Sequence, residues 1–327
     1  MPATNSPIIG HRENIDFLCH AKERGRLAHA YLFVGPERIG KRAVARHFGA
    51  ELLATSPWDI DHHPDFFLLE RERDKKTVKL HGSIVIEQVL ALVGRLARTS
   101  FMRGWKICVL DGADRLQEAA ANALLKSLEE PAGRTLLVLL AESADGVLAT
   151  LRSRCQILTF RPVAAETIAG ALIAVDGIPP AQAEIYARLS GGRPGVALEL
   201  ARDSAAFRAL RERREGVLRF LAGGVPERWE EAAKLLPAKL PFREAGDRVE
   251  ELLDLAAELL RDALHISLGR SEDVQHADIA DRLRDLAATC PGPAGLRIAL
   301  ENLAAARQLV RENVSPRAAL EKWGVGF

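Results

Sequence analysis

Short apolar runs alternate with amphipathic stretches through the first half of the chain. Apolar runs with the length of buried strands lie at 31–34, 66–69, 106–110, 136–140 and 156–160. Between them, apolar positions recur at the spacing of one helix face at 41–54, 84–98, 117–130 and 146–151. Strands that alternate with helices are typical of a parallel sheet covered on both faces. We therefore expect an α/β domain built on a parallel five-stranded sheet.

After Phe160 the pattern is helical throughout. Gly- and Pro-rich breaks divide it at 177–180, 191–194, 223–226, 237 and 291–293. The short stretches before Ser204 predict a small helical domain, and the longer ones after it predict an all-α domain. A self-contained helical bundle and an oligomerisation domain give the same pattern, so periodicity alone leaves both open.

Length and charge narrow the class of protein. The 327 residues are too many for one compact core and suit two or three domains. Lys and Arg number 45 against 44 Asp and Glu, so the chain is almost neutral. A protein held to nucleic acid mainly by phosphate contacts would be more basic. Any DNA contact is therefore expected to be local.

The cysteines and the apolar runs indicate the compartment. Cys19, Cys108, Cys155 and Cys290 are far apart and form no CxxC pair, which is typical of reduced thiols. No stretch of 18 apolar residues occurs, and the first residues show no apolar signal region. We expect a soluble cytoplasmic protein with no membrane partner.

The stretch "YLFVGPERIGKRAVARHF" has the spacing of a phosphate-binding loop between a strand and a helix. In such a loop, Gly35, Gly40 and Lys41 would hold phosphates through backbone N–H groups and the lysine amine. The next residue should be Ser or Thr, whose hydroxyl ligates magnesium, but it is Arg42. A guanidinium has only donors and cannot ligate a cation. The alternative is an ordinary glycine turn.

A second acidic position should complete an ATPase site. The strand in "WKICVLDGADRL" ends at Asp111, which is placed to hold magnesium. The following residue is Gly112, where an active enzyme of this type carries a glutamate that positions water. Glycine cannot do this. The alternative for Asp111 is a turn or helix acid without a ligand.

Ordered motifs connect these features to a known family. The stretches "IIGHRENIDFL", "RLAHAYLFVGP", "HPDF", "ICVLDGADRLQEAAANALLKSLEEP" and "LRSRCQILTF" occur over about residues 8–200, and "RENVSPRAALEKW" follows near the C-terminus. In order and spacing they resemble the AAA+ subunits of bacterial clamp loaders, and the delta-prime branch of that family in particular.

The resemblance implies an AAA+ P-loop domain at 1–162, a small helical lid at 163–203 and an all-α collar at 204–327 that assembles subunits into a ring. Ser153, Arg154 and Cys155 match the family's Ser-Arg-Cys motif. Arg154 would then be an arginine finger that acts on ATP in the neighbouring ATPase subunit. The alternative is a local ion pair for Arg154 and simple packing for Cys155.

Further family positions bear on the chain's own nucleotide site. Asp114 and the polar sensor Ser143 would join the degenerate phosphate loop. The lid arginine of active members aligns with Gly195, although a shifted alignment would place Arg193 there. No nucleotide is expected to be required, and weak binding of ATP or ADP is left open.

The resemblance departs from the family at one point. Relatives commonly carry a four-cysteine zinc module before the second strand, but here this segment reads "ATSPWDIDHHPDF". His62 and His63 alone cannot form a tetrahedral zinc site. We expect no zinc and no other metal.

Three functions are weighed. The first is a non-hydrolysing clamp-loader stator with gamma or tau ATPase subunits and a delta subunit as partners, and with the sliding clamp and primer–template DNA reached through the complex. The second is a self-sufficient AAA+ ATPase, which would need a replacement for the missing glutamate. The third is a nucleic-acid-binding module, against which the near-zero net charge argues.

Overall fold

The computed structural model describes residues 8–71, 82–102, 104–237, 239–290, 292–312 and 314–325. The predicted break at Pro291 and the outer ends of the first and third predicted domains lie outside these residues. The chain divides into two compact units, residues 1–177 with 192–197, and residues 178–191 with 198–327. The division into three domains stays a prediction.

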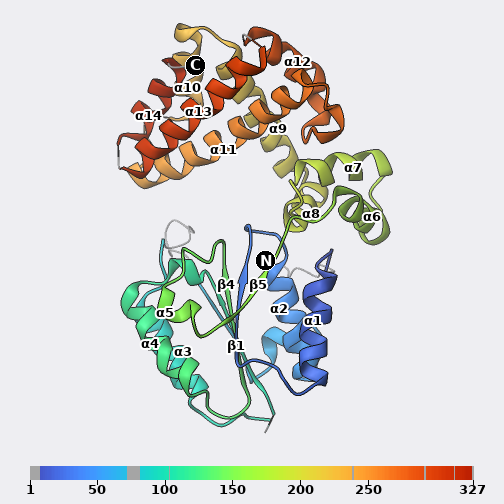
Figure 1. Cartoon of the computed structure of the whole chain (residues 1–327), viewed down its shortest axis with the longest axis vertical. Helices are drawn as coiled ribbons and strands as arrows, with labels where there is room; N and C mark the ends of the chain where they lie inside the picture. Colours follow the sequence, from blue (N-terminus) through green and yellow to red (C-terminus); the bar gives the residue numbers. More distant parts are fainter. Residues whose placement is uncertain are drawn as a thin grey trace. The chain divides into compact units, whose positions relative to one another are not determined.

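The first unit contains the expected parallel sheet of five strands, in the order β2-β3-β4-β1-β5 (Figure 1). The strands are β1 (Ala30–Val34), β2 (Phe66–Glu70), β3 (Lys106–Asp111), β4 (Thr135–Ala141) and β5 (Gln156–Thr159). Every pair of neighbouring strands is parallel. The carboxyl ends of the strands therefore meet at one edge of the sheet, where the loops after β1, β3 and β4 begin.

Helices cover both faces of this sheet (Figure 1). They are α1 (Arg12–Glu23), α2 (Lys41–Leu52), α3 (Ile86–Leu96), α4 (Glu118–Glu129) and α5 (Ala149–Arg152). Side chains alternate between the two faces along a strand. In β1, Tyr31 and Phe33 pack in the core formed with Phe48 of α2. Leu32 packs in the other core, with Leu124 of α4. A strand buried on both faces explains why the apolar runs are continuous.

The observed elements differ from the predicted ones mainly at their ends. The apolar pattern did not indicate α1. The helix predicted at 146–151 begins only at Ala149. Residues 143–147 form a turn instead, in which Gly146 N donates to Ser143 Oγ at 3.1 Å and Val147 N donates to Ala144 O at 3.3 Å. Local side-chain acceptors of this kind compete with the helix and delay its start.

Asp65, immediately before β2, ties the loop after α3 to the sheet. Its carboxylate is buried and accepts hydrogen bonds from Phe101 N at 2.7 Å, Met102 N at 2.9 Å and Ser100 Oγ at 3.0 Å. Burial raises the pKa of Asp65, but these donors outweigh it and leave the pKa below its ordinary value. A carboxyl group with a depressed pKa stabilises the fold above its unfolded pKa, and the contribution is lost as pH falls through the folded pKa.

Replacing Asp65 with alanine is expected to lower the free energy of unfolding by about 2 kcal/mol, because three donors lose their acceptor. Urea denaturation followed by circular dichroism measures the change. Asp59→Ala serves as the control, since the exposed Asp59 forms no side-chain cap bond and its loss should cost less than about 0.5 kcal/mol. Equal losses for the two variants would contradict this role of Asp65.

The described residues after Thr159 form helices and loops, as the pattern predicts. The α-helices are α6 (Ala165–Asp176), α7 (Pro180–Leu189), α8 (Pro194–Arg202), α9 (Ser204–Ala222), α10 (Val225–Leu235), α11 (Phe242–Ser267), α12 (Ala280–Thr289), α13 (Gly292–Arg311) and α14 (Pro316–Val325). Among the described residues of the second unit, Leu253 and Leu260 of α11 pack with Leu296 of α13 in an apolar core. Phe220 of α9 stacks on Trp323 of α14 with ring centroids 5.0 Å apart.

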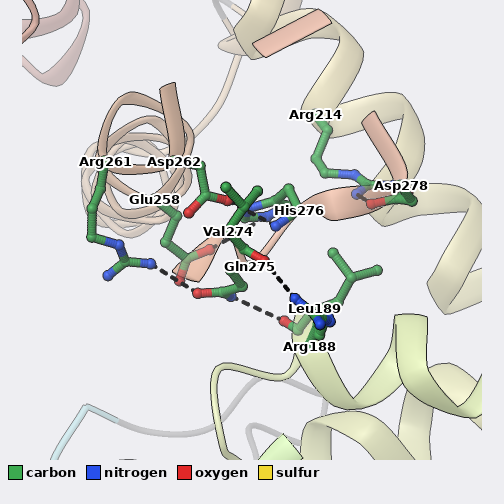
Figure 2. A network of polar contacts seen from close by, with 10 residues as sticks. All are labelled: Arg188, Leu189, Arg214, Glu258, Arg261, Asp262, Val274, Gln275, His276 and Asp278. Carbon is green, nitrogen blue, oxygen red and sulfur yellow. Dashed lines mark hydrogen bonds and ion pairs between the residues drawn. The ribbon is translucent and has the colours of Figure 1, made fainter. Parts of the chain in front are cut away.

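A buried polar network connects α11 to the segment before α12 within the second unit (Figure 2). Asp262 Oδ2 accepts hydrogen bonds from His276 N at 2.7 Å and from His276 Nδ1 at 2.9 Å. Neither side chain is more than 1% exposed. Gln275 continues the network by donating to Leu189 O at the end of α7 and accepting from Arg261. Polar groups therefore fix this segment against two helices.

Candidate functional site

The predicted phosphate loop joins β1 to α2, and its two glycines occupy positions that other residues would not fit. Gly35 has φ 156°, and a Cβ there would lie 2.5 Å from Phe160 O. Gly40 has φ 119° and is the N-cap residue of α2. Positive φ of this kind is strained for residues with a Cβ. The motif thus reflects backbone geometry at the start of α2.

Lys41 is the first residue of α2 and turns its amine back onto the loop. Its side chain is buried, and Nζ donates to Gly35 O at 2.5 Å and to Pro36 O at 2.9 Å. Burial lowers the pKa of Lys41, while Asp111 and Glu142 oppose this shift. The spacing of the motif therefore brings the amine against the loop carbonyls and within the field of Asp111. Its role in binding phosphate stays a prediction.

Arg42 takes the place of the expected hydroxyl and pairs with two carboxylates. Arg42 Nη1 lies 2.6 Å from Glu70 Oε2 and 3.6 Å from Asp111 Oδ2. Glu70 and Asp111 are the last residues of β2 and β3 and are partners in the register of the sheet. The guanidinium thus offsets one of the two negative charges at the ends of these strands. This donor set does not fit magnesium, because a fixed positive charge and no hydroxyl stand at position 42.

The residues after β3 complete this edge. Burial raises the pKa of Asp111, and the charges of Arg42 and Lys41 partly offset the effect. Gly112 has φ 100° and offers no side chain to orient water. Asp114 lies in the 3-10 helix that follows, 3.9 Å from Arg115 Nε. The carboxylate of Asp114 also acts on the Lys41 amine, whose pKa it raises.

Sequence reasoning missed two acids at this edge, Glu70 and Glu142. Glu70 holds Arg42, and Glu142 Oε1 accepts a hydrogen bond from Arg115 Nη2 at 3.0 Å. Glu70 lies beside Asp111 because β2 pairs with β3. No short sequence motif indicates the order of the strands, so Glu70 could not be identified from the sequence. Ser143, the predicted sensor, accepts the turn bond from Gly146.

The Ser-Arg-Cys motif follows α5, and its three side chains behave differently. Ser153 Oγ donates to Thr150 O at 3.1 Å. Arg154 is 37% exposed, and its Nη2 lies 2.6 Å from Glu129 Oε1 at the end of α4. Cys155 packs against the core that α3 and α4 share with the sheet. Burial raises the pKa of its thiol to about 11, so Cys155 stays protonated. Cys155 therefore packs the motif against the core and exposes no reactive thiolate.

The predicted lid position lies directly on the phosphate loop. Gly195 N donates to Arg38 O at 2.9 Å, and a Cβ at Gly195 would lie 2.8 Å from the same oxygen. Both residues belong to the first unit. A side chain at this position would displace the loop, so an arginine there is incompatible with this arrangement. Arg193 accepts backbone bonds from Val196 and Ala197, and its proposed role stays a prediction.

The predicted absence of metal stays a prediction as well. Across the described residues, no three His, Cys, Asp or Glu side chains are grouped to hold an ion. His62 closes a short 3-10 helix, and the ring of His63 accepts a hydrogen bond from Asp65 N at 3.2 Å. The described helices include none that is long and apolar enough to cross a membrane.

Comparisons with known proteins agree with the motifs. The sequence profile described as DNA polymerase III, delta subunit, matches residues 10–164. The DNA polymerase III subunit delta-prime of Escherichia coli is 30% identical over 292 residues, which cover 84% of this chain and 81% of that protein. The DNA polymerase III subunit delta-prime of Pseudomonas aeruginosa is 38% identical over 192 residues, which cover 54% of this chain and 57% of that protein.

Two solved structures also align with much of this chain. A DNA polymerase III gamma subunit-related protein from Thermotoga maritima aligns with 91% of this chain and 99% of its own, with a TM-score of 0.45 and 18% identity. RuvB from the same organism aligns with 62% of this chain and 65% of its own, with a TM-score of 0.45 and 20% identity.

Proposed function

Since the chain belongs to the family of DNA polymerase III delta-prime subunits, we propose that it is a non-hydrolysing stator of the clamp loader in DNA replication. In this role it braces a ring of ATPase subunits of the gamma or tau type together with a delta subunit. The sliding clamp and primer–template DNA are reached through the assembled complex. The chain's own site requires no nucleotide and no metal, and weak binding of ATP or ADP is left open.

The observation that carries the proposal is the position of Arg42 between Glu70 and Asp111. An ATPase of the P-loop type uses this position for the hydroxyl that ligates magnesium. In this chain the guanidinium of Arg42 stands at that position and pairs with Asp111 and Glu70. Gly112 also lacks the carboxylate that would position water. Arg42 and Gly112 thus deprive the site of groups needed for hydrolysis, while the loop keeps its fold.

Arg154 supplies the active part of the proposed role. Its side chain is partly exposed in the motif after α5, so a neighbouring subunit can reach it. A guanidinium provided in trans stabilises the charge that builds up on a transferred phosphoryl group. Because it acts in the neighbour's site, the defects at Arg42 and Gly112 do not affect it.

The isolated chain tests the first half of this proposal. Purified protein with ATP and Mg²⁺ is expected to release phosphate no faster than its Lys41→Ala variant, because the ligand set at position 42 excludes magnesium. A phosphate-release assay measures both. Turnover of about one per second or faster, lost on Lys41→Ala, would instead identify a self-sufficient ATPase and overturn the proposal.

A further inference from the structure

Glu129 contacts Arg154 through a single carboxylate oxygen. Glu129 Oε1 accepts hydrogen bonds from Arg154 Nε at 2.9 Å and from Arg154 Nη2 at 2.6 Å. On the other side, Arg154 Nη1 donates to Thr150 O at 3.0 Å and lies 3.4 Å from Ser153 Oγ. The guanidinium is thus held from two directions, by α4 and by the motif's own turn.

This arrangement leaves part of the guanidinium available. Arginine carries five N–H donors in a rigid planar fork, two of them on Nη2. Across the described residues, Nη2 makes one hydrogen bond, to Glu129. A second Nη2–H therefore points away from the pair. An oxyanion that approaches this edge finds a donor whose direction is already set by Glu129.

Charge at the end of α4 favours the same geometry. Glu129 is the last residue of α4, where the helix carbonyls carry a partial negative charge. A carboxylate at this end of a helix is unfavourable by itself. The guanidinium of Arg154 offsets the charge of the carboxylate and the partial negative charge of the helix end. The two side chains are 37% and 51% exposed, so the pair contributes little to folding stability. Its main physical effect is on where the guanidinium points.

We propose that Glu129 is a positioning residue for Arg154. It holds the guanidinium on the chain's own surface with one edge directed outward, toward a phosphate oxygen of the nucleotide in the adjacent subunit. This inference rests on the proposed function, since it needs Arg154 to act in trans. An arginine that is already oriented loses less freedom when the phosphoryl group is transferred, and misplacement by about 1 Å can cost a hundredfold in rate.

The test uses the chain assembled with the clamp-loader ATPase subunits from its own organism. Steady-state ATP turnover is measured for the wild type and for Arg154→Ala, and the difference defines the Arg154-dependent turnover. Glu129→Ala is expected to lower this Arg154-dependent turnover about tenfold with no change in KM for ATP. Glu129→Gln keeps an acceptor oxygen and should restore much of the loss. Adding Glu129→Ala to Arg154→Ala should cause no further loss.

Controls separate positioning from folding and assembly. Glu130→Ala changes the next, exposed residue and should leave turnover as in the wild type. Size-exclusion chromatography follows assembly, and thermal unfolding of the isolated chain should be the same for all the variants. If Glu129→Ala fails to fold, Glu129→Gln provides the comparison on its own, with an intermediate loss expected.

The outcomes distinguish the two proposals. If Arg154→Ala lowers turnover and Glu129→Ala does not, Glu129 has no positioning role, while the stator function stands. Higher turnover in either Glu129 variant would mean that the carboxylate competes with phosphate, which also overturns the inference. A loss that adds to that of Arg154→Ala would show that Glu129 acts independently. Unchanged turnover in Arg154→Ala would overturn both proposals.

Discussion

Replacing Arg154 with alanine is expected to lower ATP turnover at the adjacent subunit of the assembled complex by about a thousandfold or more, equivalent to about 4 kcal/mol. Under the proposed function, the charge that builds up on the transferred phosphoryl group would lose the guanidinium that stabilises it. Because the substitution should affect the adjacent site alone, total turnover is expected to fall by about that site's share. DNA-stimulated phosphate release by the reconstituted complex measures this loss, and size-exclusion chromatography should show unchanged assembly.

Arg152 offers a matched control two residues earlier. Its Nη1 lies 2.8 Å from Asp145 Oδ1 and donates to Ala144 O at 3.1 Å, and its exposed fraction is similar to that of Arg154. Arg152→Ala is therefore expected to keep wild-type turnover. Wild-type turnover in Arg154→Ala, or an equal loss in both variants, would argue against a specific action of Arg154 in trans.

Replacing Asp262 with alanine is expected to lower the free energy of unfolding by about 3–5 kcal/mol. Asp262 is fully buried and accepts both the backbone and the ring hydrogen bonds of His276, as Figure 2 shows. Without the carboxylate, two buried donors have no acceptor, and His276 Nε2 still lies 3.8 Å from Glu258 Oε2. Urea denaturation monitored by circular dichroism reports the change.

A control on the same helix separates burial from charge. Asp254 of α11 pairs with Arg307 but is 65% exposed, so Asp254→Ala should cost at most about 1 kcal/mol. A similar cost for both variants would contradict the importance of the buried network.

Burial raises the pKa of Asp262, but the hydrogen bonds from His276 outweigh it and leave the pKa below its ordinary value.

The direction of this shift predicts a pH dependence for the same variant. A depressed folded pKa means that the stabilisation is present above the unfolded pKa, about 3.9 for Asp, and is lost as pH falls through the folded value. The wild type should therefore lose this contribution in acid, below about pH 4. Asp262→Ala lacks this carboxyl group, so its stability should not show this loss below about pH 4.

The fold of the first unit was predictable because the central strands β1, β3 and β4 are buried along nearly their whole length and read as continuous apolar runs. The edge strand β5 is mostly exposed, with only Leu158 buried. The turn from β1 into α2 was predictable for a different reason, since Gly35, Gly40 and Lys41 lie within one short segment and the two glycines fix its backbone geometry. Neither signal depends on contacts between distant segments. The start of α5 was less predictable, because the competing bond from Gly146 to Ser143 leaves no mark in the apolar pattern.

The partners of the two arginines could not be predicted. Glu70 reaches Arg42 only because β2 lies beside β3, and Glu129 reaches Arg154 only because α4 ends near α5. Both contacts join residues 25 or more positions apart. The order of the strands and the packing of the helices determine which residues form these ion pairs. No local sequence pattern indicates either one.

The ion pairs of Arg42 have a consequence for how this chain can evolve. Serine at position 42 would leave Glu70 and Asp111, neighbours across two strands, without the cation that separates their charges. Their repulsion would be felt at once, whereas hydrolysis would still lack a carboxylate at Gly112. Under the proposed function, Arg42→Ser alone is therefore expected to lower stability without restoring ATP hydrolysis. Recovery of activity would then require changes at both Arg42 and Gly112.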